Sequence, residues 1–173
     1  MALRAPSRNS QQLIGAFLAF AALPTAPVGQ TLTATSGMPV RIEIVASCVV
    51  SASDLDFGAY NTSSATPARG QTTIELQCSP GLVAEVNLDA GTAPGANTSR
   101  RKLRSESGGN RIDYGLYQDT GRTVHWGDTP GVDTREVLTT GAPQTVPVYG
   151  EIPAGQRGQE GTYSDEITVR VHF

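Results

Sequence analysis

The sequence predicts one all-β domain, an antiparallel β-sandwich, and three observations lead to this prediction. Apolar residues repeatedly alternate with polar ones at a period of two, as in strands that are buried on one face. Turn-forming residues separate these segments about every 8 to 15 residues, which is typical of sandwiches. No segment after residue 30 shows a convincing helical period of 3.6 residues. A length of 173 residues suits a single domain of ordinary size.

The composition agrees with a turn-rich globular chain. Gly (19) and Pro (11) together make up 30 of the 173 residues, which exceeds a usual share of roughly 12%. The glycines have no period of three, so the chain is not collagen-like. The formal net charge of −3 excludes a general nucleic-acid binder that works by counterion release.

The first 29 residues predict a signal peptide that does not belong to the fold. Residues 1–12 carry Arg4 and Arg8 without any acidic residue, and an uninterrupted apolar run of eleven follows at 13–23. Eleven helical residues span about 16 Å, roughly half a bilayer core, so the run is too short for a membrane span. Because it has no polar face, a buried amphipathic helix is disfavoured. Cleavage is expected somewhere between residues 26 and 34.

The first alternating segment of the mature chain covers residues 38–45. Its apolar face carries Met38, Val40, Ile42 and Ile44, and its polar face carries Pro39, Arg41 and Glu43. This alternation predicts a strand.

Five further alternating segments follow, at residues 71–78, 82–91, 111–119, 143–152 and 162–173. The last of them is the cleanest, because only Asp165 interrupts an apolar phase that ends in Ile167, Val169, Val171 and Phe173. All five predict strands of the sandwich, and the turn-rich stretches between them predict its loops.

One basic cluster, consisting of Arg100, Arg101, Lys102 and Arg104, interrupts the alternation. Such a cluster favours a solvated loop or strand edge, because charged side chains are seldom buried. Anion binding is the alternative interpretation.

The two cysteines, Cys48 and Cys78, both lie beyond the signal peptide. An exported protein folds under oxidising conditions, which favour a disulfide between them. A zinc site would need more ligands, and neither His125 nor His172 has a ligand spacing. A thiol nucleophile would need a nearby His and a reducing compartment.

The sequence contains no motif that indicates catalysis or a cofactor. It lacks the Gly-x-Ser-x-Gly elbow, the His-Glu-x-x-His pair and a phosphate-binding glycine loop. His125 and Asp128 lie close in sequence, but no nucleophile accompanies them, and they favour a strand end followed by a turn. We therefore expect no enzyme, no cofactor and no metal.

The two ends of the predicted sandwich indicate strand exchange between chains. A soluble sandwich protects its edge strands with charge, proline or bulges. Here the mature chain begins with a loose arm and the alternating segment 38–45, and it ends on the alternating segment 162–173. A strand donated into another sheet gains a ladder of backbone hydrogen bonds and pockets for alternate side chains. Head-to-tail donation builds open fibres.

Several motifs in order resemble the spore coat protein U domain family. The first are Cys48 to Ala52 (CVVSA), LDFGAY at 55–60 and Cys78. They are followed by IDYGLYQD, TVHWGD, VPVYGEIPAGQ and GTYSDEITVRVHF, at 112–119, 123–128, 146–156 and 161–173. The resemblance covers about residues 45–173 and extends to the subunits of archaic, Csu-type chaperone–usher pili.

This resemblance implies an immunoglobulin-like pilin fold that lacks one strand and is completed by a donor strand. It implies a secreted fibre subunit that passes through the periplasm to the cell surface. Its partners would be a periplasmic chaperone, an outer-membrane usher, and copies of itself or sibling pilus subunits. A related coat function is the second possibility that the family name raises.

Carried onto this chain, the resemblance divides it into a signal peptide (1–29), a donor-strand extension (30–45) and a sandwich domain (46–173). Cys48 and Cys78 match the disulfide of the family. The donor would lie within 31–45, with Val40, Ile42 and Ile44 as its inserted side chains. The last strand would border the acceptor groove and contact the chaperone, through Gly161, Tyr163, Ile167, Val169, Val171 and Phe173.

Pro39 restricts the donor register, because proline cannot donate a hydrogen bond to a sheet. Insertion therefore begins after Pro39, or Pro39 lies where a missing N–H costs nothing. An upstream donor centred on Leu32 and Ala34 is the alternative, but it offers little apolar surface. A buried Val or Ile contributes about 1.5–3 kcal/mol, which favours Val40, Ile42 and Ile44.

A monomeric secreted or spore-coat surface binding module is the alternative function. It would need exposed aromatic residues gathered at one loop end, and Trp126, Tyr149 and Tyr163 have the pattern of core or strand positions. A tip adhesin would need an added binding domain, so we expect a shaft or adaptor subunit.

Overall fold

The computed structural model describes residues 34–173. The chain divides into two units, Met1–Arg41 and Ile42–Phe173. Residues 34–41 are exposed and have no regular secondary structure, and the strands all belong to the second unit. The predicted signal peptide at 1–29 and the alternative donor residue Leu32 lie outside the described residues.

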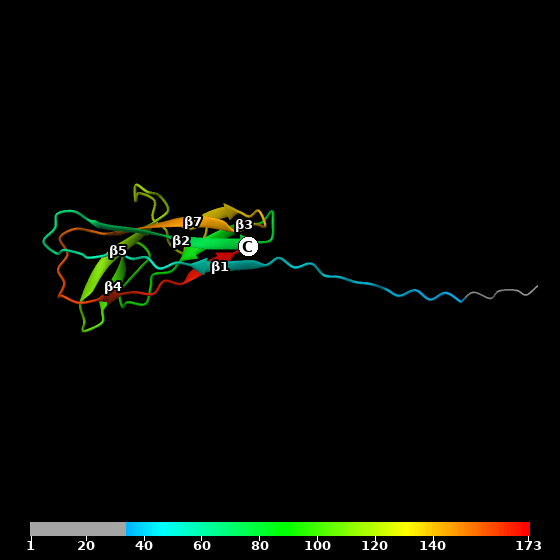
Figure 1. Ribbon diagram of the computed structural model, residues 1–173, viewed down its shortest axis with the longest axis horizontal. Coiled ribbons are helices and arrows are strands. Elements are labelled where there is room, and N and C mark those ends of the chain that lie inside the picture. Colours follow the sequence, from blue (N-terminus) through cyan, green and yellow to red (C-terminus); the bar gives the residue numbers. More distant parts are fainter. Residues whose placement is uncertain (1–33) are drawn as a thin grey trace, which may run out of the picture. The chain divides into compact units, whose positions relative to one another are not determined.

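The second unit is an antiparallel β-sandwich of two sheets (Figure 1). Six strands form the larger sheet in the order β1-β2-β7-β5-β4-β8, and three form the smaller sheet in the order β6-β3-β9. The strands are β1 (Cys48–Ala52), β2 (Ala68–Cys78), β3 (Val83–Leu88), β4 (Arg101–Ser105), β5 (Arg111–Tyr117), β6 (Arg135–Leu138), β7 (Gln144–Ile152), β8 (Tyr163–Ser164) and β9 (Val169–His172).

The hydrophobic core lies between the two sheets and follows the period-two alternation of the strands. Its fully buried members include Ile74 and Leu76 of β2, Val86 and Leu88 of β3, and Trp126. The indole nitrogen of Trp126 donates a hydrogen bond to the carbonyl oxygen of Val86 at 2.9 Å. The tryptophan therefore belongs to the core, as its sequence pattern predicts.

The alternation predicts β2, β3, β5 and β7 correctly, but three strands have no such signal. These are β1, β4 and β6, which are short and have few large apolar residues in phase. The segment 38–45 is not a strand here: residues 34–47 have no regular secondary structure. Alternation indicates which residues suit a strand, but a strand also needs a partner to hydrogen-bond.

The predicted last strand, 162–173, is wrong as a single element. It forms two short strands in different sheets, because β8 pairs with β4 and β9 pairs with β3. The break falls at the one residue that interrupts the apolar phase. The Asp165 carboxylate accepts hydrogen bonds from the backbone amide and the hydroxyl of Thr92, at 2.9 and 3.1 Å. These bonds hold the crossing segment away from both ladders.

The prediction of a solvated basic cluster is wrong for Arg101, which is fully buried, whereas Arg100 and Arg104 are exposed. The Arg101 guanidinium group donates to four backbone carbonyl groups, those of Leu88, Asp89, Thr98 and Trp126, at 2.7–2.8 Å. Burial lowers the pKa of Arg101 below its usual value. The side chain thus ties β4 to the end of β3 and to the tryptophan loop.

Within residues 34–173, no helix has the length and the hydropathy that a membrane span requires. The same residues contain no group of three or more His, Cys, Asp or Glu side chains that could hold a metal ion.

Candidate acceptor groove

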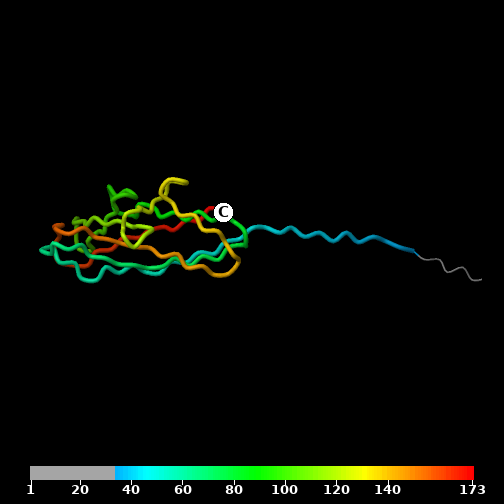
Figure 2. Tube along the Cα trace, turned by 90° about the horizontal axis from the view of Figure 1, so that it is seen from above, coloured from blue at the N-terminus to red at the C-terminus, as the bar shows by residue number. Residues whose placement is uncertain are grey.

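Two strands at neighbouring sheet edges have an unpaired side. In the described residues, β1 pairs only with β2, and β9 pairs only with β3. The two strands lie side by side, as the two views in Figures 1 and 2 show, but they share no register pair. Each therefore presents backbone N–H and C=O groups that a further strand could pair with.

The side chains that face the core from these two edges are left uncovered. Val50 and Ala52 of β1 are the register partners of Leu76 and Ile74, and opposite residues share a face of the sheet. Leu76 and Ile74 are each 1% exposed, whereas Val50 is 37% exposed and Ala52 is exposed too. The core is thus closed over β2 and open over β1.

The same contrast holds on the facing sheet. Val169 and Val171 of β9 are the register partners of Leu88 and Val86, which are fully buried. Val169 and Val171 are only half-buried, and Phe173, which follows in the same phase, is 55% exposed. Core-facing side chains are therefore incompletely covered along both edges.

A cavity of about 320 Å³ opens between residues 52–57 and 165–169. Its apolar floor belongs to both sheets and consists of Ile74, Leu88, Leu103, Leu116 and Val148. A second hollow of about 920 Å³ adjoins it, between residues 54–62 and 158–165, over Leu103, Ile112 and Ile152. The two share Asp54, Leu55, Phe57, Leu103 and Asp165. We call the combined depression the groove.

One wall of the groove, which contains Leu55 and Phe57, packs against a pair of glycines. Gly70 of β2 and Gly150 of β7 are register partners on the core face. A Cβ atom on Gly150 would lie 2.7 Å from side-chain carbons of both Leu55 and Phe57, and one on Gly70 would lie 2.8 Å from the carbonyl oxygen of Asp56. The missing side chains make the space into which this wall packs.

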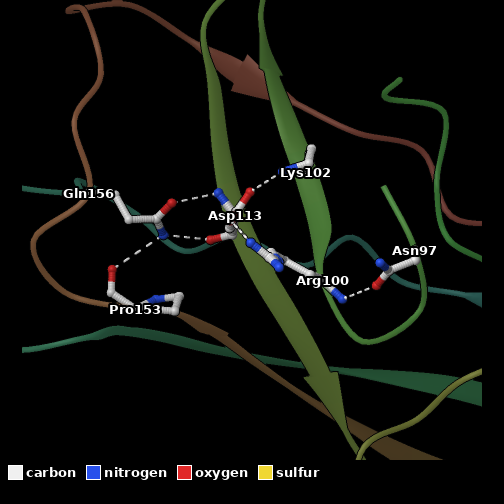
Figure 3. A network of polar contacts seen from close by, with 6 residues as sticks. All are labelled: Asn97, Arg100, Lys102, Asp113, Pro153 and Gln156. Atoms are coloured by element: carbon white, nitrogen blue, oxygen red, sulfur yellow. Dashed lines mark hydrogen bonds and ion pairs between the residues drawn. The ribbon is translucent and has the colours of Figure 1, made fainter. Parts of the chain in front are cut away.

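Tyr60 fastens the same wall to the loop that follows β7. Its hydroxyl donates to the carbonyl oxygen of Pro153 and accepts from the amide of Gln156, both at 2.9 Å. The Gln156 side chain in turn bonds both backbone groups of Asp113 at 2.7 Å, as Figure 3 shows. The Asp113 carboxylate is paired with Lys102 at 2.6 Å. The network therefore links the groove wall to β4 and β5.

Asp165 anchors the opposite wall. Besides Thr92, it accepts a hydrogen bond from the hydroxyl of Tyr114 at 2.9 Å, at the floor of the groove. Burial and the neighbouring Asp165 carboxylate raise the pKa of Tyr114 well above its usual value. The hydroxyl is therefore a permanent donor at ordinary pH, and it fixes the position of the crossing segment.

The residues predicted for the acceptor strand are spread along this wall. Ile167 and Val169 line the first cavity, and Gly161 and Tyr163 line the second. Val171 and Phe173 line neither. The Tyr163 hydroxyl donates to the carbonyl oxygen of Gln159 at 2.9 Å. Four of the six predicted residues thus line the groove, and they belong to the bend before β8, to β8, to the crossing segment and to β9.

The predicted donor residues are exposed in this chain. Val40, Ile42 and Ile44 are 82%, 86% and 88% exposed. At the base of this segment, Cys48 and Cys78 form a disulfide between the first residue of β1 and the last residue of β2.

Sequence reasoning missed the wall formed by Leu55, Phe57 and Tyr60. These residues lie in a segment without regular secondary structure, so no strand periodicity marks them. The LDFGAY motif at 55–60 contains all three residues. In the sequence it indicates the family resemblance, but not that these residues form a wall.

The chain is similar to a protein family, to a protein of known sequence and to a solved structure. A family model described as the Spore Coat Protein U domain matches residues 34–170. Protein U of Myxococcus xanthus is 28% identical, and the match covers 92% of this chain and 96% of that protein.

One of the similar solved structures is a chain in the chaperone–tip adhesion subunit pre-assembly complex CsuC–CsuE from the archaic chaperone–usher Csu pili of Acinetobacter baumannii. It superposes with a TM-score of 0.55 at 22% identity, over 75% of this chain. The match spans 40% of the solved chain. At this identity the likeness concerns the fold.

Proposed function

The chain belongs to the Spore Coat Protein U domain family, and we propose that it is a secreted structural subunit of a surface fibre assembled by donor-strand exchange. The observation that carries this proposal is the uncovered core between β1 and β9. Val50, Ala52, Val169 and Val171 face the core, yet no strand of the described chain closes over them. A strand supplied by another chain would complete both ladders and the core.

The donor in this proposal is the segment 38–45 of a second copy or a sibling subunit. Its side chains Val40, Ile42 and Ile44 alternate at the spacing of a strand and are exposed to solvent. Each would contribute about 1.5–3 kcal/mol if buried fully. Pro39 sets the upstream limit, because it has no N–H to donate to a ladder.

The proposal includes the steps that precede assembly. A signal peptide over residues 1–29 directs export, a periplasmic chaperone occupies the groove first, and an outer-membrane usher exchanges it for the next subunit. The mature chain is then a donor extension (30–45) and a sandwich domain (46–173), in a shaft or adaptor position. The likeness in fold to a pilus subunit solved in complex with its chaperone supports the chaperone as a partner.

A matched pair of variants tests the donor assignment. Ile42→Asp with Ile44→Asp places charges where the groove requires apolar side chains, and it should abolish polymers of the exported full chain. Arg41→Ser with Glu43→Ser changes the outward positions of the same segment and should leave polymers in place. Electron microscopy and size-exclusion chromatography of the surface fraction provide the measurement. Normal fibres from the first variant would overturn the assignment.

A further inference from the structure

The groove is lined by acidic residues and by no basic ones. Five carboxylates belong to its two cavities, those of Asp54, Asp56, Glu160, Asp165 and Glu166, whereas neither lining contains Lys, Arg or His. The whole chain has 16 acidic and 13 basic residues. An excess of five to none therefore concentrates negative charge at the groove.

These carboxylates are not neutralised by ion pairs. None of the salt bridges in the described residues includes any of the five. The hydrogen bonds that Asp165 and Asp56 accept come from uncharged groups. Arg170, which points outward from β9, lies 3.8 Å from Asp89 and is partly balanced there.

The carboxylates flank an apolar floor. They therefore contact other side chains of an incoming strand than those that the floor contacts. Side chains in one phase of that strand would enter the core, and those in the other phase would face outward beside the acidic rim. A field of one sign over a groove raises the association rate of oppositely charged ligands. The outward side chains therefore determine how fast a strand enters.

The donor segment of this chain is electrostatically neutral in its outward phase. Arg41 and Glu43 are its two charged residues, and their charges cancel. We propose that the groove selects its incoming strand by charge as well as by apolar fit, with Arg41 favouring entry and Glu43 opposing it. This inference rests on the proposed function. It identifies the preferred ligand as a strand with aliphatic residues in one phase and Lys or Arg in the other.

A peptide series tests the selection. The probes are capped peptides of residues 34–47 with a neutral dye, in wild-type form and with Glu43→Lys or Arg41→Glu. The receptor is the full chain with Ile42→Ser and Ile44→Ser, so that its own segment does not compete. At low salt we expect Glu43→Lys to associate about three- to tenfold faster than wild type, and Arg41→Glu to associate slower by a similar factor. At about 1 M salt the three rates should converge.

A rim variant links the effect to the groove. Asp54→Asn with Glu166→Gln changes two exposed positions. It should reduce the differences among the association rates of the three peptides at low salt, while the wild-type peptide still binds. Equal association rates for the three peptides at low salt would overturn the charge selection and leave the donor assignment intact. Rate differences that are the same in the receptor and in its rim variant would have the same consequence. Failure of all three peptides to bind at any salt concentration would overturn both.

Discussion

Gly70 and Gly150 face each other across β2 and β7, and the groove wall packs into the space that their missing side chains leave. Leu55 and Phe57 fill that space from a segment with no strand pairing of its own. The position of one groove wall is thus determined by two backbone sites in the middle of the larger sheet.

Gly150→Ala should destabilise the domain and displace this wall. The new Cβ would lie 2.7 Å from Leu55 and from Phe57, so both side chains must move. Overpacking of this kind costs about 1–3 kcal/mol, which urea denaturation measures as a lower midpoint at an unchanged slope. Gly108→Ala is the control, because nothing lies within 4 Å of its Cβ. Equal midpoints for the two variants would contradict the packing argument.

Arg101→Met should cost more than any other single substitution in the basic cluster. It removes the donors to four backbone carbonyl groups, and an unsatisfied buried polar group costs about 1–3 kcal/mol. We expect a loss of at least about 3 kcal/mol in the free energy of unfolding. Arg100→Met is the matched control, because its side chain is 67% exposed and its ion pair with Asp113 is 3.7 Å long. The control should change stability by less than about 1 kcal/mol.

Alkaline pH should destabilise the chain through Tyr114. In the folded state burial and Asp165 raise the pKa of this tyrosine, whereas in the unfolded state it ionises near pH 10. Above that pH the unfolded state binds fewer protons, so stability is complete below about pH 10 and falls as the pH rises. One such group gives a slope of up to about 1.4 kcal/mol per pH unit. Urea denaturation at pH 9 and 11 measures it.

Tyr114→Phe should remove the part of the stability loss at alkaline pH that Tyr114 causes, and Asp165→Asn should reduce that part. The second variant keeps the size of the side chain but takes away the negative charge beside the hydroxyl. The same pH dependence in wild type and Tyr114→Phe would show that other groups cause the loss.

Reduction of the disulfide should weaken the domain by about 3–4 kcal/mol, because it opens a loop between residues 30 positions apart. The measurement is the free energy of unfolding with and without a reducing agent. Cys48→Ser with Cys78→Ser should reproduce the reduced value and lose its response to the agent. A response that persists in the double variant would contradict the assignment.

The sequence predicts those strands in which the alternating apolar residues form one face of the strand and that face is buried. β2 and β7 satisfy this condition, with Ile74, Leu76, Val146 and Val148 all buried. β4 does not, because its inward positions are Arg101, Leu103 and Ser105. In a run of polar residues, the sequence does not distinguish an arginine that is buried among carbonyl groups from one that is exposed.

The groove is predictable only in part, for a similar reason. Alternation marks Ile167, Val169 and Val171, but it treats residues 162–173 as one strand. A single carboxylate, Asp165, assigns the two halves to different sheets through its contacts with Thr92 and Tyr114. Those partners are 73 and 51 residues away in the chain, so local periodicity contains no information about them.

The disulfide sits where a pulling force would enter the domain. Tension applied along residues 42–47 reaches Cys48, the first residue of β1, and the covalent bond transmits it to Cys78 at the end of β2. The other four register pairs between β1 and β2 lie beyond that point and are shielded from peeling. Mechanical strain is thereby passed to β2, a central strand that is paired on both sides.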